Sequence, residues 1–371
     1  SALFMFAAGT GLSEKTRMKI AVAHTDFPCF KVKCNPEYLT KGYCQLNVEP
    51  YGGMLKSTWF DRPLGVAGKV ALRTEDIYAP KTALFDSGEA VLVIPSLAPH
   101  MDGKSGQKQE YDMQRELQPV YGMGSADFTE YIAKKLSVDR EDLLSFDLFL
   151  YNRDKPERIG AGGEFICSPR IDNLASVAAL TEAIEGAMPD GEIALCACFD
   201  HEEVGSRSKQ GADSALLPIL LQKIEEGLLA GGSVQSGWSM REALLNGFLL
   251  SVDGAHAVHP NYTDKSDPTN EVVLGGGIAV KTSASQRYIS DGEGLAVIKQ
   301  LCQRDGVSYQ TQVNRSGMPG GQTLGPIVSS YLPVQGADIG LPMLGMHSAR
   351  ETAVCRDYAQ LVKFLKGFFV S

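Results

Sequence analysis

The sequence predicts an α/β fold in which a mostly parallel sheet is flanked by helices and carries a β-rich insertion. From about Gly160 to the end, short apolar runs alternate with amphipathic stretches, a pattern typical of parallel strands joined by helices. Between about Val32 and Arg158, the chain is rich in glycine, proline and short β-type runs, which favours a small β-rich module. A length of 371 residues suffices for one large or two ordinary domains.

The apolar run at residues 20–23 precedes the β-rich stretch but resembles the strands that follow it. We therefore assign this run to the same sheet as the later strands. The predicted domains are an α/β domain of residues 1–32 and 159–371, and an inserted β-rich domain of residues 33–158.

Each predicted element follows from its local pattern. The continuous apolar run at 192–199 (EIALCACF) indicates a strand buried on both faces, whereas the spacing at 214–229 indicates a helix. The β-type runs of the insertion are separated by turn residues such as Pro50-Tyr51-Gly52-Gly53. The other predicted strands are 20–23, 45–48, 69–72, 90–94, 247–252 and 341–346, and the other predicted helical segments are 128–136, around Leu143, 174–184, 294–301 and 358–369.

Composition excludes several classes of protein. With 35 basic against 44 acidic residues, the formal charge of −9 argues against nucleic-acid binding, which needs clustered Lys and Arg. No apolar run approaches the roughly 20 residues that cross a bilayer, and the apolar start lacks the basic flank of a signal peptide. The eight cysteines form no CxxC pair, so we expect core thiols in a cytoplasmic protein.

Charged and imidazole side chains follow most of the predicted strands. Parallel sheets bind ligands at the carboxyl ends of their strands, so these side chains are expected to lie at one edge. One further acid opens the helix after Arg170-Ile171. The candidates are His24, Asp26, Asp172, Glu202, Glu203, Asp253 and His347.

This set fits a site for two metal ions. Five members of the set, two imidazoles and three carboxylates, provide the nitrogen and oxygen donors that suit Zn²⁺ or Mn²⁺, and one bridging carboxylate would let them hold two ions. In the Glu202-Glu203 pair, one residue can bind metal while its neighbour acts as a general base. The structural alternative is that single acids such as Asp172 only cap helices. Neither a GxSxG motif nor an HExxH motif is present.

Longer runs of residues resemble the aspartyl aminopeptidases, the M18 family of binuclear zinc exopeptidases. These runs occur in order along the whole chain, and the two positions that depart from the family pattern are Gly317 and Ser285. The matching runs are 24–28 (HTDFP), 51–53 (YGG), 57–62 (STWFDR), 170–173 (RIDN), 202–206 (EEVGS), 253–261 (DGAHAVHPN), 346–351 (MHSARE) and 366–369 (KGFF).

The resemblance implies a role for each metal-ligating candidate. Asp172 would bridge two Zn²⁺ ions, one of which Mn²⁺ or Co²⁺ could replace. His24 and Asp253 would complete the site of one ion, and Glu203 and His347 that of the other.

The resemblance also implies roles for residues that do not bind metal. Glu202 corresponds to the general base and Asp26 to the acid that orients His24. Lys281 and His256 correspond to the pocket for the substrate's first side chain, although a solvated strand lysine is the alternative for Lys281. His100 corresponds to a histidine that the β-rich domain supplies to a neighbouring subunit.

The implied activity is that of a metallo-aminopeptidase that removes N-terminal residues, preferring Asp or Glu, through hydroxide activated by two metals. The implied fold is a zinc exopeptidase domain with an inserted dimerisation domain, and the implied assembly is a dodecamer built from dimers. The alternatives are a related deacylase or carboxypeptidase with the same ligands, and a non-catalytic scaffold on this fold.

Overall fold

The computed structural model describes residues 2–101, 110–187, 189–318 and 320–370, which form two compact units. The first unit comprises Ser1–Phe27, Glu157–Met346 and Glu351–Ser371. The second comprises Pro28–Pro156 and the short segment His347–Arg350. The boundary drawn at residues 32 and 33 falls inside a strand, Cys29–Thr40, that belongs entirely to the second unit.

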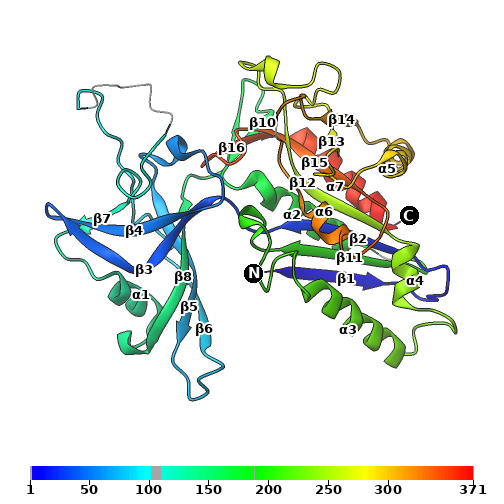
Figure 1. Cartoon of the computed structure of the whole chain (residues 1–371), viewed down its shortest axis with the longest axis horizontal. Coiled ribbons are helices and arrows are strands. Elements are labelled where there is room, and N and C mark those ends of the chain that lie inside the picture. The colour runs from blue at the N-terminus through cyan, green and yellow to red at the C-terminus, as the bar shows by residue number, and fades with distance from the viewer. Residues whose placement is uncertain (1, 102–109, 188, 319, 371) are drawn as a thin grey trace. The chain divides into compact units, whose positions relative to one another are not determined.

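The first unit is built on a ten-stranded sheet, and the predicted α/β fold is confirmed (Figure 1). Its strands are β1 (Leu3–Ala8), β2 (Met18–His24), β9 (Glu157–Ile159), β10 (Phe165–Ser168), β11 (Ile193–Phe199), β12 (Phe248–His256), β13 (Ile278–Thr282), β14 (Tyr309–Val313), β15 (Gly336–Leu344) and β16 (Glu351–Val354). The central order is β11-β2-β12-β15, with every neighbouring pair parallel. Towards the edges, β1, β16, β10 and β9 pair antiparallel with their neighbours. Strand β13 pairs antiparallel with β15 and parallel with β14.

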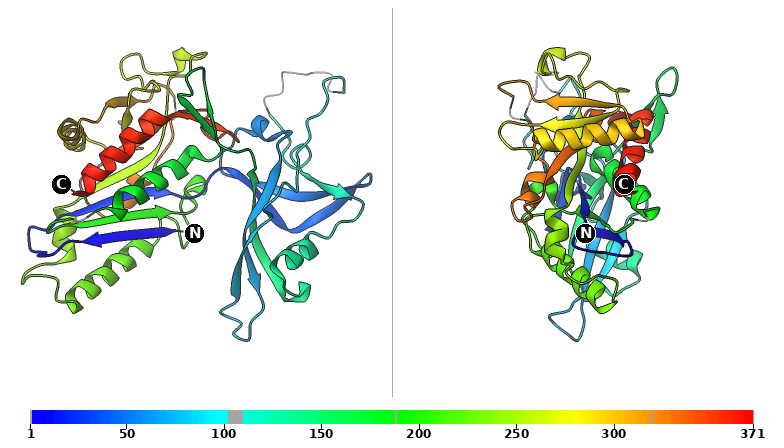
Figure 2. Two further views of the ribbon diagram at one scale, coloured as in Figure 1. Left: turned by 180° about the vertical axis from the view of Figure 1, so that it is seen from behind. Right: turned by 90° about the vertical axis from the view of Figure 1, so that its right-hand side faces the viewer.

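Helices cover both faces of this sheet. Successive residues of a strand point to opposite sides, so each central strand contributes side chains to two separate cores. On β11, Leu195 and Ala197 pack into one core, while Cys196 and Cys198 pack into the other. Figure 2 shows α2 and α7 lying across the face that carries the two cysteines. The helices are α2 (Ile171–Glu185), α5 (Gly292–Asp305) and α7 (Cys355–Val370) on that face, and α3 (Leu216–Ala230), α4 (Met240–Leu245) and α6 (Leu324–Ser329) on the other, with short 3₁₀ turns η3 (Glu202–Val204) and η4 (Thr263–Lys265).

The parallel centre brings the ends of separate strands together. His24, the last residue of β2, is in register with Phe199, the last residue of β11. The amide of Thr25 donates to the carbonyl of Phe199 at 2.8 Å, so the two chains leave the sheet side by side. Because β2 and β11 are parallel neighbours that end in register, the polar residues that follow them lie close together.

The second unit is built on a six-stranded antiparallel sheet with the order β6-β5-β8-β3-β4-β7. Its elements are β3 (Cys29–Thr40), β4 (Tyr43–Tyr51), β5 (Leu64–Leu72), β6 (Lys81–Asp86), β7 (Val120–Met123), β8 (Leu143–Asn152), α1 (Phe128–Leu136) and the 3₁₀ turns η1 (Lys56–Trp59) and η2 (Arg140–Asp142). Helix α1 spans the residues predicted for it. The prediction of a helix around Leu143 is wrong, because Leu143 is the first residue of β8, which pairs with β5. The strand expected at 90–94 is reduced to isolated bridges of Leu92 and Val93.

The eight cysteines are all free thiols. Cys29, Cys44, Cys196, Cys198 and Cys302 are buried, as expected for small core residues. Cys34 is exposed on β3, and two more thiols are half-buried. Among the described residues, no helix has the length and apolar character needed to span a bilayer.

Candidate metal centre

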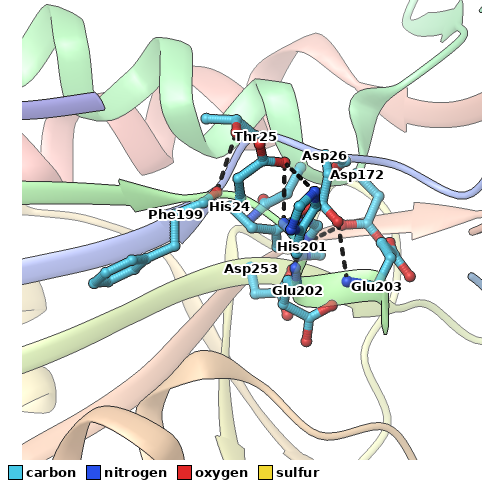
Figure 3. A network of polar contacts seen from close by, with 12 residues as sticks. His24, Thr25, Asp26, Asp172, Phe199, His201, Glu202, Glu203 and Asp253 are labelled. Atoms are coloured by element: carbon cyan, nitrogen blue, oxygen red, sulfur yellow. Dashed lines mark hydrogen bonds and ion pairs between the residues drawn. The ribbon is translucent and has the colours of Figure 1, made fainter. Parts of the chain in front are cut away.

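His24 lies at the centre of a buried polar network at the end of β2 (Figure 3). Its Nδ1 lies 3.1 Å from the carbonyl oxygen of Asp26, which can only accept a hydrogen bond. Nδ1 therefore carries a proton, and Nε2 is the nitrogen that the neutral ring would offer to a metal ion. Nε2 faces Asp172 Oδ1 at 3.4 Å and Asp253 Oδ1 at 3.3 Å.

Asp172 is placed by the irregular start of α2. Arg170 has a left-handed backbone, and Asp172 and Asn173, joined by a cis peptide bond, have non-helical backbone angles. The amide of Asp172 donates to Glu351 Oε2 at 2.9 Å. The side chain of Asn173 donates to the carbonyl of Val252 at 3.0 Å, which ties this turn to β12. The Asp172 carboxylate thus faces His24, a contact that a residue serving only as a helix cap would not need.

Glu202 and Glu203 are held by Asp26 through their backbones. The chain leaves β11 through His201, which has a left-handed backbone, and enters the turn η3. The amide of Glu202 donates to Asp26 Oδ1 and the amide of Glu203 to Asp26 Oδ2, each at 3.1 Å. One carboxylate therefore fixes both glutamates, while the carbonyl of the same residue orients the His24 ring.

The residues of this centre fit a metal ion. One ligand atom each from His24, Asp172 and Glu203 lie within 4.8 Å of one another. Asp253 adds a further carboxylate beside the same His24 nitrogen. Imidazole nitrogen and carboxylate oxygen are the donors that zinc takes in catalytic sites, and such closely spaced carboxylates repel one another unless a cation balances them.

The electrostatics of the centre are consistent with a bound cation. Burial, opposed by His24 and reinforced by neighbouring acids, raises the pKa of Glu202 to about 7 and that of Glu203 to about 10. Burial lowers the pKa of His24, but hydrogen bonds with surrounding aspartates outweigh it and leave the pKa well above its usual value. Burial raises the pKa of Asp253, yet Lys281 and His24 outweigh it and lower that pKa overall. A cation among the glutamates would favour their ionised forms.

Lys281 is not a solvated strand lysine. Its side chain on β13 is 3% exposed, and its Nζ lies 4.0 Å from Asp253 Oδ2 and 5.5 Å from the ring centre of Tyr288. On β15, the fully buried Asp338 is in register with Lys281. The hydroxyl of Thr323 donates to Asp338 Oδ1 at 2.6 Å. A buried lysine flanked by two acids thus lies directly behind the candidate ligand Asp253.

The other candidates lie at more exposed positions. His256 ends β12 and is exposed, and His100 is exposed in the second unit. His347 also belongs to the second unit, where its Nδ1 lies 2.9 Å from the carbonyl of Gly53. His201 is hydrogen-bonded to the hydroxyl of Ser208 at 2.8 Å.

Sequence reasoning assigned no role to Glu351, Asn173 or Asp338. Glu351 lies in the matching run 346–351, but the sequence does not show that it accepts a hydrogen bond from the amide of Asp172. Asp338 lies within an apolar run, and a charge in a buried strand is a signal of its own because it needs a partner there. Asn173 acts through a backbone carbonyl, which no sequence pattern reveals.

Nitrogen and oxygen donors gathered at the carboxyl edge of a parallel sheet are the arrangement expected of a metal-dependent enzyme. The family model described as "Aminopeptidase I zinc metalloprotease (M18)" matches residues 1–369. The chain therefore belongs to the M18 family of zinc metallo-aminopeptidases, hydrolases that act on peptides, and the resemblance found in the sequence is confirmed.

Individual relatives agree with this assignment. A "Probable M18 family aminopeptidase 2" from Clostridium novyi is 41% identical over 376 residues, which cover 100% of this chain and 86% of the relative. A relative of the same name from Pseudomonas aeruginosa is 37% identical, with the same coverage of 100% and 86%.

Solved structures agree as well. The crystal structure of prApe1 matches with a TM-score of 0.90 and 27% identity, over 99% of this chain and 82% of that one. The S. cerevesiae mApe1 dodecamer matches with a TM-score of 0.81 and 25% identity, over 99% and 83%.

Proposed function

We propose that this aminopeptidase removes the first residue of peptides with a free amino terminus, prefers aspartate or glutamate there, and uses Glu202 as its general base beside two metal ions. The observation that carries the proposal is the single carboxylate of Asp26, which fixes Glu202 and Glu203 together. With both backbones fixed, Glu202 would act as the proton acceptor beside Glu203 as the metal ligand. Hydrolysis by a metal-activated water needs a base held at such a position.

In this proposal, His24 and Asp253 would hold one ion, Glu203 and His347 would hold the other, and Asp172 would serve both. The distances around His24 Nε2 and the close grouping of His24, Asp172 and Glu203 support the part of the assignment that concerns the first unit; His347 enters through the family resemblance. When bound, the ions supply Lewis-acid chemistry that acidifies water and polarises a carbonyl oxygen. Zinc is the metal of the family, and one position is expected to accept Mn²⁺ or Co²⁺.

Glu202 moves the proton in the proposed reaction. Its side chain accepts a proton from the attacking water and returns it to the departing amine nitrogen. Burial raises the pKa of Glu202 and a bound cation would oppose that rise, so the carboxylate would be ionised and able to accept a proton from water. Asp26 keeps this side chain in place through the backbone amide at 3.1 Å, so Asp26 is a positioning residue.

Matched peptides test the reaction class. We expect release of the first residue from a peptide with a free amino terminus and no cleavage of the same peptide after acetylation, because the chain belongs to an aminopeptidase family. The measurement is chromatography of the products, with and without a chelator, and activity should be lost when the metal is removed.

Other outcomes identify the alternatives. Cleavage of the acetylated peptide would indicate a deacylase, and loss of the last residue would indicate a carboxypeptidase. A chain that binds no zinc, manganese or cobalt and cleaves nothing would indicate a scaffold.

The preference for an acidic first residue rests on charge. Lys281 places a buried cation beside Asp253, and His256 follows on the same strand as that acid. An ammonium group that is shielded from water binds a carboxylate strongly. For Lys281→Met, we expect kcat/KM to fall about tenfold or more on peptides that begin with Asp or Glu, and much less on peptides that begin with Leu.

Lys19→Met is the matched control. Lys19 is also buried and also pairs with an acid, Glu192, but it lies at the opposite end of β2 from His24. Its replacement should leave the ratio between acidic and Leu substrates unchanged. An equal loss on both substrates in Lys281→Met would show that the lysine supports Asp253 rather than substrate choice.

We further propose that the chain forms a dodecamer built from dimers and works in the cytoplasm. A structural neighbour is described as a dodecamer, and the second unit exposes large apolar side chains at Ile77, Tyr78 and Leu84. His100 of one copy is proposed to serve the active site of another copy. Eight free thiols suit a reducing compartment, and peptides are the expected partners rather than nucleic acids or membranes.

A further inference from the structure

The segment that carries His347 is bound by hydrogen bonds within the β-rich second unit. The carbonyl of His347 accepts from the amide of Leu55 at 2.8 Å. Its ring Nδ1 lies 2.9 Å from the carbonyl of Gly53. Residues 53–55 therefore contact both the backbone and the ring of His347.

Thr58 holds the next turn of this segment. Its hydroxyl accepts from the amide of Ala349 at 2.8 Å and donates to the carbonyl of Leu55 at 2.6 Å. One hydroxyl thus links the 347–350 segment to residue 55, the same residue whose amide binds His347. The link passes through backbone groups on both sides, so it fixes the path of the chain.

Asn152, at the end of β8, completes the attachment. Its side chain is buried and donates to the carbonyl of Ala349 at 2.9 Å. Its Oδ1 accepts from the amide of Asp154 at 3.0 Å, so its orientation is determined on both sides. Asp154 in turn pairs with Arg62 at 2.5 Å and with Arg350 at 3.7 Å.

These contacts maintain a backbone that His347 would not otherwise prefer. His347 has a φ of +66°, a left-handed conformation that is unfavourable for a residue with a Cβ. Such a conformation persists where surrounding bonds determine it, and it is often associated with a functional position. The contacts of Gly53, Thr58 and Asn152 provide that constraint.

The ring of His347 is oriented as the ring of His24 is. In both residues Nδ1 faces a backbone carbonyl, of Gly53 for one and of Asp26 for the other. The proton is then on Nδ1 and the lone pair on Nε2, the nitrogen through which a metal would be bound. The two candidate imidazole ligands thus share one tautomer, each fixed by its own unit.

We propose that Thr58 and Asn152 are positioning residues for His347, the candidate zinc ligand that the second unit carries. The inference rests on the proposed role of His347 as a ligand. It also gives a function to the motifs 51–53 and 57–62, whose residues Gly53, Thr58 and Arg62 lie in this network.

The test measures the affinity of each of the two zinc positions by competition with a chelator. Thr58→Val keeps the shape of the side chain and removes the hydroxyl. We expect it to weaken one zinc position about 10–100-fold and to leave the other unchanged. Added zinc should restore kcat, and Thr58→Ser should behave like the unmodified chain.

Ser87→Ala is the matched control for Thr58→Val. The Ser87 hydroxyl makes the same pair of bonds in the same unit, accepting from the amide of Val66 at 3.1 Å and donating to the carbonyl of Glu89 at 2.8 Å. Zinc affinity should not change in Ser87→Ala. An equal loss of zinc in both variants would show that only the stability of the unit matters, and would overturn the inference.

Asn152→Asp provides an independent test that does not depend on Thr58. It removes the donor to Ala349 and keeps the size and the acceptor, and we expect the same zinc position to weaken. Its control is Gln118→Glu, because the buried Gln118 amide donates to Met113 and Val48, away from this segment.

His347→Ala distinguishes the role of His347 as a zinc ligand from the roles of Thr58 and Asn152 in positioning it. If it retains two tightly bound zinc ions, the ligand assignment itself is wrong. If it loses one ion while Thr58→Val and Asn152→Asp keep both, only the positioning inference is wrong.

Discussion

Glu202→Gln is expected to lower kcat about 10²–10⁴-fold while both metal ions remain bound. Glutamine keeps the length of the side chain but cannot accept the proton of the attacking water. The amide of Glu202, rather than its carboxylate, binds Asp26, so the turn should survive the substitution. The measurements are kcat on a peptide with a free amino terminus and the zinc content of the purified protein.

The control for this substitution is Glu182→Gln. Glu182 lies on α2 and pairs with Lys366 at 2.8 Å on the surface. Its replacement should leave kcat unchanged. A Glu202→Gln protein with normal turnover would remove Glu202 as the base, and one that lost its zinc would place Glu202 among the ligands.

Asp172→Asn is expected to reduce both zinc content and turnover. Asparagine has nearly the same shape, but it presents one neutral oxygen where the proposal needs two charged ones. Because the carboxylate is proposed to hold both ions, the loss of affinity should affect both positions. It should exceed the roughly 10–100-fold loss that follows removal of a hydrogen-bond partner behind a ligand. Metal analysis after dialysis, together with kcat, measures the effect.

Asp357→Asn is the comparison for a buried acid without a metal role. Asp357 is fully buried at the start of α7 and accepts from the amides of Gly275 and Gly277 at 2.7 and 2.9 Å. Its replacement should lower thermal stability and leave zinc content unchanged. Two ions retained in Asp172→Asn would contradict the bridging role, whatever the rate.

Periodicity in the sequence predicted the elements that bury a continuous apolar surface. The strand at 192–199 and the helix at 128–136 were found almost to the residue, because each has a uniform pattern along its length. The strand β15 begins earlier than predicted, at Gly336, since its glycines and Asp338 interrupt the apolar run. The long strand β3 was missed although it pairs with the next strand, β4, because a register shift between Val32 and Glu37 interrupts its pattern. The strand β8 was missed because it pairs with the distant β5.

The site was predictable to the extent that it follows from strand ends. His24 ends β2 and the Glu202-Glu203 pair follows β11, and an edge shared by these strands brings them together, whereas Asp253 lies within β12, which continues to His256. The contacts of Asp26 with two amides were not predictable, because a backbone group has no sequence signature. Nor could the sequence show that residues 347–350 return to the inserted unit, since that depends on a pairing with residues almost 300 positions earlier.

Two thiols, Cys196 and Cys198, lie on the face of β11 that packs against α2, and their burial affects their chemistry. Cys198 precedes Phe199, whose register partner is His24, so a soft sulfur ligand lies one residue from the end of the strand. Burial raises the pKa of Cys198 to about 12 and also raises that of Cys196. Only the deprotonated thiol captures metal ions or reacts quickly with oxidants. The apolar packing against α2 therefore keeps both thiols protonated at neutral pH and slows their reaction with oxidants.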